Sequence, residues 1–386
     1  MDRRDITKVL AGSVAGAMLL TKRAEAQSCV GPCYSQTAAE VAANVTPVNY
    51  SYPPGDVRRY GAVLDNWTND WQALTDAIAQ SVVNAGAPVY IAGFLAVNAS
   101  VVLLSGATIC GDGPAFSGIK GLANNFSILT DNNSPVADIV IQDLLFSAVS
   151  IGSSNRGIFL DADTSNTAER ITVRRCKFKT LFRGANLHRV QGLVFDDCEG
   201  ENLGSSVVYV GLSTSGGRSS GVRIRRTRMV GGDTSPDSSG SGILFVGYSD
   251  LVTIDDAEFI DTGAYDPGAL TTHHHSIYVR DVTDISITKV KSRGQRKGAG
   301  VQVYSDVGAG EAKCKRVTIS DVQVTGTYNY AGLRIDNVDG LTLSNIHCED
   351  CYTQAIYLSN ISEANVFGVI ARNNNRQITN YTRVFF

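Results

Sequence analysis

Aromatic and charged side chains recur in pairs along the C-terminal half of the chain, with the two members of each pair two residues apart. The pairs are Tyr278 with Arg280, Gln302 with Tyr304, and Arg334 with Asp336. Side chains two residues apart on a strand point to the same face of the sheet. Aromatic rings cover the apolar face of a pyranose, and charged forks fix its hydroxyl and carboxylate groups. These side chains are therefore the first candidates for a sugar-binding groove.

The same spacing extends the set in both directions along the chain. The further pairs are Phe159 with Asp161, Asn186 with His188, Tyr209 with Gly211, Leu244 with Val246, and Tyr357 with Ser359. The pair at 244 and 246 has two registers one residue apart, because its strand precedes the next by nine residues instead of eight. We predict that Tyr278, Gln302, Tyr357, His188 and Tyr209 bind the substrate. The alternative is an exposed sheet that tolerates polar side chains.

Two kinds of bond cleavage fit these residues. In β-elimination a base removes the proton beside a uronate carboxylate, whose charge is neutralised by arginine or by a cation such as calcium. Arg280 and Arg334 are candidates for neutralisation, and Tyr278, Tyr304 or an arginine can be the base if its pKa is lowered. In hydrolysis two carboxyl groups flank the bond, and Asp306 with Asp336 is the nearest pair on adjacent repeats. The catalytic candidates are thus Arg280, Tyr304, Arg334, Asp336 and Asp306.

Three consecutive histidines, His273, His274 and His275, precede the strand that begins near Ile277. Consecutive side chains on an extended segment point alternately, so at most two of the three share a face. They can act as a metal site, as an acid or base, or as a plain polar loop, and we keep His275 as a substrate-binding candidate. No Cys/His cluster has the paired spacing of a zinc site, so we predict no metal site.

A repeat that covers more than half of the chain supplies the scaffold. Nine times the sequence reads apolar, x, apolar, x, x, apolar or small, x, apolar or small. The repeats start at Ile139, Ile171, Leu193, Val222, Val252, Ile285, Val317, Leu341 and Ala364. Alternation at period two marks strands, and the extra spacer residue marks a bend between two of them. Repeats of this kind predict an all-β solenoid of one chain, a parallel β-helix.

The outward charges of this repeat change sign from one repeat to the next. The repeat at Ile171 carries Arg174, Arg175 and Lys177, whereas the next carries Asp196, Asp197 and Glu199. Adjacent turns of a β-helix lie about 4.8 Å apart, so opposite charges become neighbours. We predict that structural ion-pair ladders occupy this face.

The cysteines are divided between the core and the two ends of the chain. Cys176 and Cys198 share an inward position on consecutive repeats, which predicts small core residues. Cys29 with Cys33, and Cys348 with Cys351, are close enough in sequence to form disulfides.

Residues 1–26 have the features of an export signal. Arg3 and Arg4 precede an apolar run, and Ala24-Glu25-Ala26 supplies the small residues that a signal peptidase needs. The arginine pair favours the twin-arginine route over a Sec signal. We therefore predict cleavage after Ala26 and a periplasmic or secreted protein.

Residues 27–89 are predicted to be an irregular segment that ends in a capping helix, and the β-helix to cover 90–386. Asp70 is an N-cap residue type, and Leu74, Ala77, Ile78 and Val82 fall on one face of a helix over about 70–84. Such a helix covers the first turn of the solenoid, whose open edge otherwise promotes aggregation.

The composition excludes several classes of protein. The 386 residues are 18% charged, with 34 basic and 37 acidic side chains. This excludes a disordered chain and a coiled coil, and it provides no bulk positive field for nucleic acid. No apolar run reaches the roughly 18 residues of a membrane span. We expect neither nucleic acid nor membrane as a partner after signal removal.

Two segments at the start of the solenoid resemble a known group of proteins. They are Gly-Asp-Val-Arg-Arg-Tyr-Gly-Ala at 55–62 with Asp-Asn-Trp-Thr-Asn-Asp at 65–70, and the segment 101–113 that ends in Gly-Asp-Gly. They resemble the entry of the pectate-lyase-like β-helix superfamily, in its rhamnogalacturonase/epimerase-type, polygalacturonase-related group. Asn66 replaces a usual glycine and Asn69 an aspartate, both in the cap. The resemblance implies a right-handed β-helix and, commonly, action on acidic polysaccharides, and it is specific for fold rather than chemistry.

The segment Gly-Leu-Arg-Ile-Asp at 332–336 also resembles a polygalacturonase segment that ends in Arg-Ile-Lys, but Asp336 replaces the lysine. The Asn-Thr-Asp, Asp-Asp and Gly-His-Gly motifs of that family are absent from the preceding repeats. We therefore expect an exported enzyme that cleaves an acidic, pectin-like polysaccharide, with β-elimination favoured over hydrolysis. The alternative is a non-catalytic glycan-binding β-helix, such as an adhesin or a surface-binding protein.

Overall fold

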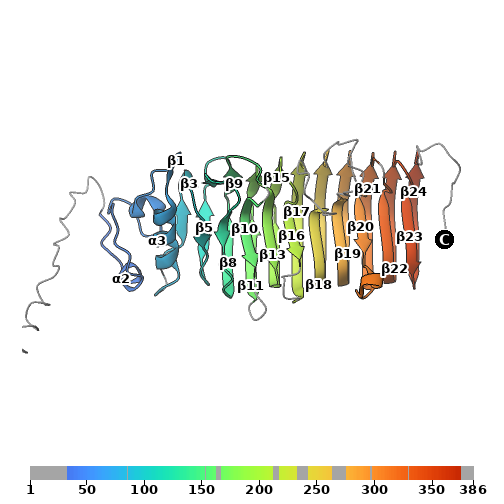
Figure 1. Ribbon diagram of the computed structural model, residues 1–386, viewed down its shortest axis with the longest axis horizontal. Helices are drawn as coiled ribbons and strands as arrows, with labels where there is room; N and C mark the ends of the chain where they lie inside the picture. Colours follow the sequence, from blue (N-terminus) through green and yellow to red (C-terminus); the bar gives the residue numbers. More distant parts are fainter. Residues whose placement is uncertain are drawn as a thin grey trace, which may run out of the picture.

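The computed structural model is a rod of stacked strands with its N-terminal helices at one end (Figure 1). The structure describes residues 33–374, except 85, 153, 162–166, 212–216, 233–241, 263–274, 296–297 and 329. The predicted signal at 1–26, as well as Cys29, His273 and His274, lies outside the described residues.

Four helices are described: α2 (Ala38–Ala42), η1 (Val57–Tyr60), α3 (Trp71–Ser81) and η2 (Val307–Ala309), where η denotes a 3₁₀ helix. The strands before the nine-fold repeat are β1 (Asp65–Asn69), β2 (Val89–Ile91), β3 (Phe94–Val97), β4 (Val101–Val102), β5 (Thr108–Gly111), β6 (Gly118–Gly121) and β7 (Ser127–Thr130). The strands of the first repeats are β8 (Val136–Gln142), β9 (Leu145–Ala148), β10 (Arg156–Asp161), β11 (Ala168–Arg174), β12 (Lys177–Lys179), β13 (Arg183–His188), β14 (Val190–Asp196), β15 (Glu199–Glu201) and β16 (Val208–Gly211). The later strands are β17 (Ser219–Val230), β18 (Gly242–Ile260), β19 (His275–Arg293), β20 (Val301–Tyr304), β21 (Cys314–Thr325), β22 (Leu333–Glu349), β23 (Ile356–Ile361) and β24 (Ala364–Arg372).

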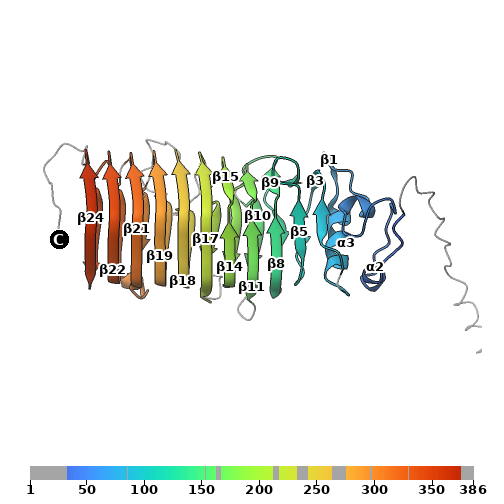
Figure 2. The ribbon, with the colours of Figure 1, turned by 180° about the vertical axis from the view of Figure 1, so that it is seen from behind.

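The strands of each turn pair in parallel with those of the turns before and after it. For example, β11 pairs with β8 on one side and β14 on the other, in register at the first residue of the repeat. Figure 2 shows β8, β11, β14 and the later strands side by side in chain order. The predicted right-handed parallel β-helix is thus confirmed, and one turn of it is called a rung below.

The spacer residue of the repeat makes a bend in every rung. It has a left-handed backbone, with φ between 47° and 65°, at Asp143, Arg175, Asp197, Arg226, Asp256, Lys289, Asp321, Asn345 and Gly368. Glycine, asparagine and aspartate reach this conformation most easily, and six of the nine positions carry one of them. The bend turns the chain while the apolar residues on both sides of it stay inside, so the predicted bend is confirmed.

The interior is made of like residues stacked from rung to rung. The Phe178 ring stacks between Phe146 and Phe195, at centroid distances of 5.4 Å and 6.1 Å. Cys176 and Cys198 are buried free thiols, as predicted. Cys348 and Cys351 are also buried free thiols, so the predicted pair is not a disulfide here, whereas Cys33 is disulfide-bonded.

The N-terminal end of the stack is covered by α3, which buries Ala73, Leu74, Ala77 and Ile78. The helix ends at Ser81, three residues before the predicted end. Asp70 is its N-cap, but the carboxylate makes no capping bond and instead accepts hydrogen bonds from Val63 N and Leu64 N.

The segment before α3 is anchored by a buried ion pair. Glu40 Oε1 and Oε2 accept hydrogen bonds from Arg59 Nε at 2.5 Å and Nη2 at 3.0 Å, and both side chains are fully buried.

None of the described helices is long and apolar enough to cross a membrane.

The outward charges of the repeat pair between rungs, as predicted. Arg175 Nε and Nη2 donate to Asp143 Oδ1 and Oδ2 at 2.6 Å and 2.7 Å, and Lys177 Nζ lies 2.6 Å from Glu201 Oε2. Arg225, Arg226, Arg228, Lys289 and Arg316 are also paired with acidic residues. These outward positions of the repeat form what we call the ladder face.

Candidate functional site

A second outer surface, the groove face, is formed by β10, β13, β16, β20, β23 and the first parts of β18, β19 and β22 (Figure 1). Strand register aligns its outward residues in two columns. The first column is Phe159, Asn186, Tyr209, Phe245, Tyr278, Gln302, Arg334 and Tyr357. The second contains Asp161, His188, Gly211, Gly247, Arg280, Tyr304, Asp336 and Ser359. The structure therefore brings together the residues that the sequence predicted to share a face.

The register at β18 differs from the sequence-based choice. Tyr209 pairs with Phe245, and Gly247 pairs with Arg280, so Phe245 and Gly247 occupy the columns. Leu244 and Val246 are fully buried, so their predicted outward position is wrong. The additional residue of this rung shifts the strand by one position, which reverses the face of every side chain in it.

The middle of the groove face is less open than the sequence predicted. Tyr278 is 8% exposed, and Gln302 and Asp336 are each 6% exposed. His275 is also buried, between the rings of Tyr278 and Tyr330, and its Nδ1 accepts a hydrogen bond of 2.9 Å from Ala299 N. His275 thus belongs to the wall of this region.

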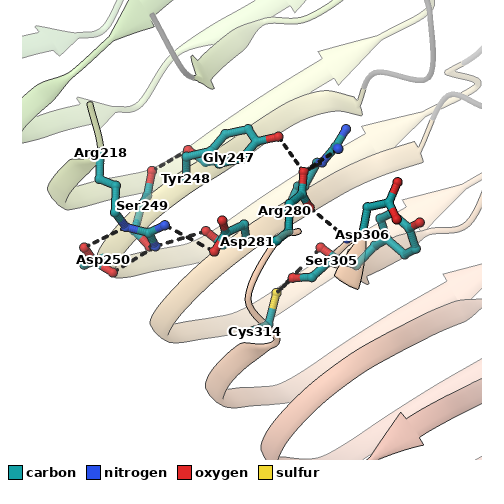
Figure 3. A network of polar contacts seen from close by, with 12 residues as sticks. Arg218, Gly247, Tyr248, Ser249, Asp250, Arg280, Asp281, Ser305, Asp306 and Cys314 are labelled. Atoms are coloured by element: carbon teal, nitrogen blue, oxygen red, sulfur yellow. Dashed lines mark hydrogen bonds and ion pairs between the residues drawn. The ribbon is translucent and has the colours of Figure 1, made fainter. Parts of the chain in front are cut away.

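Arg280 is held by a carboxylate that the sequence analysis did not identify. Glu311 Oε1 accepts hydrogen bonds from Arg280 Nε at 2.8 Å and from Tyr248 Oη at 2.7 Å, and Arg280 Nη2 also donates to it. Glu311 Oε2 accepts the backbone N–H of Asp306 at 2.7 Å (Figure 3). Burial acts to raise the pKa of Glu311, but these hydrogen bonds hold it below the ordinary value. Arg280 therefore faces a charged partner within the protein.

Arg218 shows the same kind of pairing at the bend beside this network (Figure 3). Its guanidinium donates to Asp250 at 3.0 Å and 3.1 Å, and to Asp281 Oδ1 at 3.2 Å. These contacts tie three consecutive rungs together, so we assign Arg218 a structural role.

Arg334 lies beside a small cavity near the C-terminal end of the groove face. Its Nε donates to Asp336 Oδ2 at 2.6 Å, and its Nη1 donates to Tyr330 Oη. The guanidinium carbon is 5.3 Å and 5.4 Å from the ring centroids of Tyr330 and Tyr357. Arg334, Tyr330 and Tyr357, with Ala331, Thr353 and Gln354, line a cavity of about 260 Å³. A monosaccharide unit fits a space of this size, between aromatic faces and polar groups.

Two tyrosines of this region have a raised pKa, whereas a catalytic base needs a lowered one. Burial raises the pKa of Tyr278 to about 12, although Arg280 acts in the opposite direction. Burial also raises the pKa of Tyr330. These shifts disfavour proton abstraction by Tyr278 and Tyr330.

A second group of polar residues lies at the N-terminal end of the groove face. Its residue His188 on β13 is five strand pairings from Arg334 on β22. His188 Nδ1 lies 2.5 Å from Asp161 Oδ1, on the adjacent rung. The imidazole makes edge-to-face contacts with Phe159 at 5.9 Å and Tyr209 at 6.0 Å. Burial lowers the pKa of His188 below its ordinary value, although Asp161 acts to raise it. A neutral imidazole held by a carboxylate can act as a base.

Arg156 and Arg183 lie at the first positions of β10 and β13, in register with each other. The Arg156 guanidinium covers the Phe159 ring at 4.4 Å, and that of Arg183 covers the Tyr209 ring at 4.0 Å. Burial lowers the pKa of Arg183 to about 10, and it also lowers the pKa of Arg156. Among the described residues neither guanidinium forms an ion pair, and their Nε atoms are buried without a hydrogen-bond partner. Asp161 attracts Arg156 at longer range but is bound to His188, so this part of the face carries positive charge that no ion pair of the described residues balances.

The sequence analysis selected His188 and Tyr209 from this group but missed Arg156 and Arg183. Both arginines stand directly before the small residue that opens the alternating strand, in Arg156-Gly157 and Arg183-Gly184. The repeated Arg-Gly pair on consecutive rungs was the available signal. No comparable signal marks Glu311, which lies in the connection between β20 and β21.

No group of three or more His, Cys, Asp or Glu side chains suited to a metal ion occurs in the described ranges of the chain.

Comparison with known proteins gives structural matches only. No protein-family model matches the sequence, and no curated protein matches it in sequence. The fold is similar to the enzymatically active domain of tailspike protein 2 from bacteriophage CBA120, with a TM-score of 0.61 and 11% identity over 83% of this chain and 47% of that one. It is also similar to the tailspike protein of Acinetobacter baumannii phage AM24, with a TM-score of 0.56 and 11% identity over 85% and 56% of the two chains.

The A-module of mannuronan C-5 epimerase from Azotobacter vinelandii matches 82% of this chain and 98% of its own, with 16% identity and a TM-score of 0.48. The present chain spans about half the length of the two tailspike chains. At these identities the two tailspike matches confirm the right-handed β-helix fold that the sequence resemblance implied, and they do not identify the reaction.

Proposed function

We propose that this protein is an exported enzyme that cleaves an acidic polysaccharide along the groove face, by β-elimination rather than hydrolysis. One observation carries the proposal: at the N-terminal end of this face two arginines lie over aromatic rings and form no ion pair among the described residues. Rings and unpaired guanidinium groups together suit a chain of sugars that bears carboxylates.

The two ends of the groove face have different roles in this proposal. The cavity at Tyr330, Arg334 and Tyr357 holds a sugar unit by ring contacts and hydrogen bonds, because the Arg334 charge is already balanced by Asp336. Tyr209 supplies aromatic surface at the N-terminal end, and the small exposed part of Tyr278 adds to it in the middle of the face. The predicted export signal at 1–26 is in keeping with a periplasmic or secreted location, where such polymers occur.

Elimination is supported over hydrolysis by the pairing of Asp336. Its carboxylate accepts a hydrogen bond from Arg334 and is 6% exposed. A hydrolase needs one protonated carboxyl group and one ionised carboxylate on opposite sides of the bond. A neutral histidine beside free arginines instead suits the removal of a proton next to a carboxylate.

The experiment is a panel of polygalacturonate, alginate, rhamnogalacturonan and a neutral glucan, incubated with the full chain. New reducing ends together with absorbance of an unsaturated product indicate a lyase, and new reducing ends without absorbance indicate a hydrolase. Binding without any change in polymer length supports the alternative, a glycan-binding protein. That alternative is favoured by the internal pairing of Arg280 and Arg334.

Replacement of Arg3 and Arg4 by lysine tests the export route, since a twin-arginine precursor with this change is expected to stay unexported.

A further inference from the structure

Among the described residues, Arg156 and Arg183 form no ion pair, in contrast to the other arginines of the groove face; Asp161, which attracts Arg156 at longer range, is bound to His188. Arg280 and Arg334 on the groove face, and Arg218 at the bend beside it, each bind a carboxylate at a distance that defines an ion pair. Arg156 and Arg183 instead lie over aromatic rings, one rung apart, so that the two positive charges repel each other. A half-buried guanidinium without a partner lowers stability. Such a pair is best explained by an anionic ligand that supplies the missing charge.

The same two rings connect both arginines to His188. The Arg183 guanidinium carbon is 4.0 Å from the Tyr209 centroid, which is 6.0 Å from the imidazole. The Arg156 guanidinium carbon is 4.4 Å from the Phe159 centroid, which is 5.9 Å from the imidazole. Each guanidinium therefore lies within about 10 Å of the His188 ring. A carboxylate about 3 Å from a guanidinium, with its neighbouring C–H about 3 Å from the imidazole, fits this separation.

The contact with Asp161 fixes which nitrogen of His188 can accept a proton. Asp161 Oδ1 is 2.5 Å from His188 Nδ1, so Nδ1 carries the hydrogen of the neutral ring and Nε2 carries the lone pair. Asp161 itself is anchored by its backbone, whose N–H donates to Asp131 Oδ1 on the preceding rung. The imidazole is thereby oriented before any ligand arrives.

We propose that His188 is the catalytic base of this protein and that Arg156 and Arg183 bind the carboxylate of the reacting uronate. This inference rests on the proposed function and places its reaction centre. His188 Nε2 takes the proton from C5, the C–H electron pair forms the C4–C5 double bond, and the C4–O4 bond breaks. The departing O4 takes the proton from the imidazolium, which restores the neutral histidine. Asp161 is a positioning residue, because it acts through His188.

A reaction centre near Arg280 would require more rearrangement of the protein. There a substrate carboxylate has to displace Glu311, which is bound by Arg280, Tyr248 and the Asp306 backbone. At Arg156 and Arg183 no described protein anion has to leave. The observed pairing thus favours the N-terminal end of the groove face as the reaction centre.

The first test measures turnover of polygalacturonate and alginate by His188→Gln. His347→Gln is the matched control, because His347 lies on the ladder face. We expect the His188 variant to lose about a hundredfold or more in kcat with little change in KM, and the control to keep both values. Asp161→Asn is expected to lower kcat and to change its pH profile. Circular dichroism and thermal unfolding check that each variant is folded.

The second test needs no turnover. Calorimetry with trigalacturonate and trimannuronate compares wild type with the double variant Arg156→Met, Arg183→Met. Arg175→Met on the ladder face is the control. We expect the double variant to bind at least about tenfold more weakly, and His188→Gln and the control to bind like wild type.

Each outcome bears on the placement. Full turnover by His188→Gln, or loss of turnover in Arg280→Met alone, overturns the assignment of the base while the proposed function stands. Unchanged affinity of the double variant overturns the carboxylate site. Binding that depends on both arginines but leads to no cleavage supports the anion site and overturns both the base and the proposed enzyme. A wild-type protein that neither binds nor cleaves any of the probes overturns both proposals.

Discussion

The ladder face and the groove face carry arginines on the same scaffold. Those at the N-terminal end of the groove face lack the ion pairs that those of the ladder face form with described residues. On the ladder face Arg175, Lys177 and Arg228 meet acidic residues of the neighbouring rungs. At the N-terminal end of the groove face Arg156 and Arg183 lie over aromatic rings, Arg183 also donates to the Asn186 amide oxygen, and neither forms an ion pair with a described residue. Within the aligned strands, the residue on the adjacent rung decides whether a charge is paired, whereas a connection such as that of Glu311 can supply a partner from outside them.

The largest effect is expected from acidification of the groove face. The pKa of His188 lies below its ordinary value because of burial, with Arg156 and Arg183 adding to the shift and Asp161 opposing it, while Tyr209 on the next rung supplies an uncharged ring. The base is therefore neutral at pH 7, and kcat/KM is expected to fall about tenfold per pH unit only below that lowered pKa, at a pH under the roughly 6.5 of an ordinary histidine. A pH–rate profile measures this limb. A limb well above pH 7 contradicts the assignment.

The lowered pKa of His188 is also expected to make the folded protein less stable at acidic pH. In the unfolded chain His188 binds a proton at a higher pH than in the folded protein. Between the two pKa values the unfolded state therefore holds more protons, and the free energy of unfolding decreases as the pH falls through that window. His188→Gln is expected to remove this contribution from denaturant melts recorded at several pH values.

Removal of the Glu311 charge is expected to leave Arg280 without its carboxylate partner, so that its charge is unpaired like those of Arg156 and Arg183. Glu311→Gln takes the negative charge from Arg280 and Tyr248 and weakens the anchor of the Asp306 backbone. The free energy of unfolding is expected to fall by about 2 kcal/mol, the size of hydrogen bonds to charged groups. Urea denaturation measures the change, and equal stability of the variant contradicts the role of Glu311.

Removal of an unpaired cation is expected to have the opposite sign. Arg183→Met eliminates a half-buried charge while it keeps an apolar stem over Tyr209. We expect the free energy of unfolding to rise by about 1 kcal/mol, because residues kept for ligands often lower stability. A clear loss of stability indicates instead that Arg183 is a structural residue.

The smallest effect is expected on the ladder face. Arg175→Met breaks the two hydrogen bonds to Asp143 at an exposed site. The cost is expected to be about 0–1 kcal/mol and to decrease further in 1 M salt, where such pairs are screened. A larger, salt-independent cost implies that the ladders do more than complete the surface.

The sequence predicted the scaffold well because the scaffold is periodic. Alternation fixed the inward residues, and the spacer residue fixed the bend that Asp143, Asp197 and Gly368 share. The register of β18 was wrong because one additional residue, with no signal for its location, decides between Leu244 and Phe245. The capping helix was found from its apolar face, whereas the carboxylate of Asp70 bonds to Val63 and Leu64, which a local capping rule does not anticipate.

The candidate site was predicted only in part. Residues within the alternating strands, such as His188, Tyr278 and Arg280, were placed on the correct face. Whether a charge there is already neutralised depends on Glu311, which approaches from a connection outside the repeat. Pairing of that kind follows from the path of a loop in space, which a periodic pattern does not describe.

The bend that recurs in every rung makes each rung an interchangeable unit. A duplicated or deleted rung keeps the same cross-section, because its neighbours meet the same corner and the same inward residues. Each such event lengthens or shortens the groove face by about 4.8 Å without redesign of the core. The distance between the His188 region and the cavity at Tyr357 can therefore change during evolution by one rung at a time. The number of sugar units that fit between the two ends changes with it.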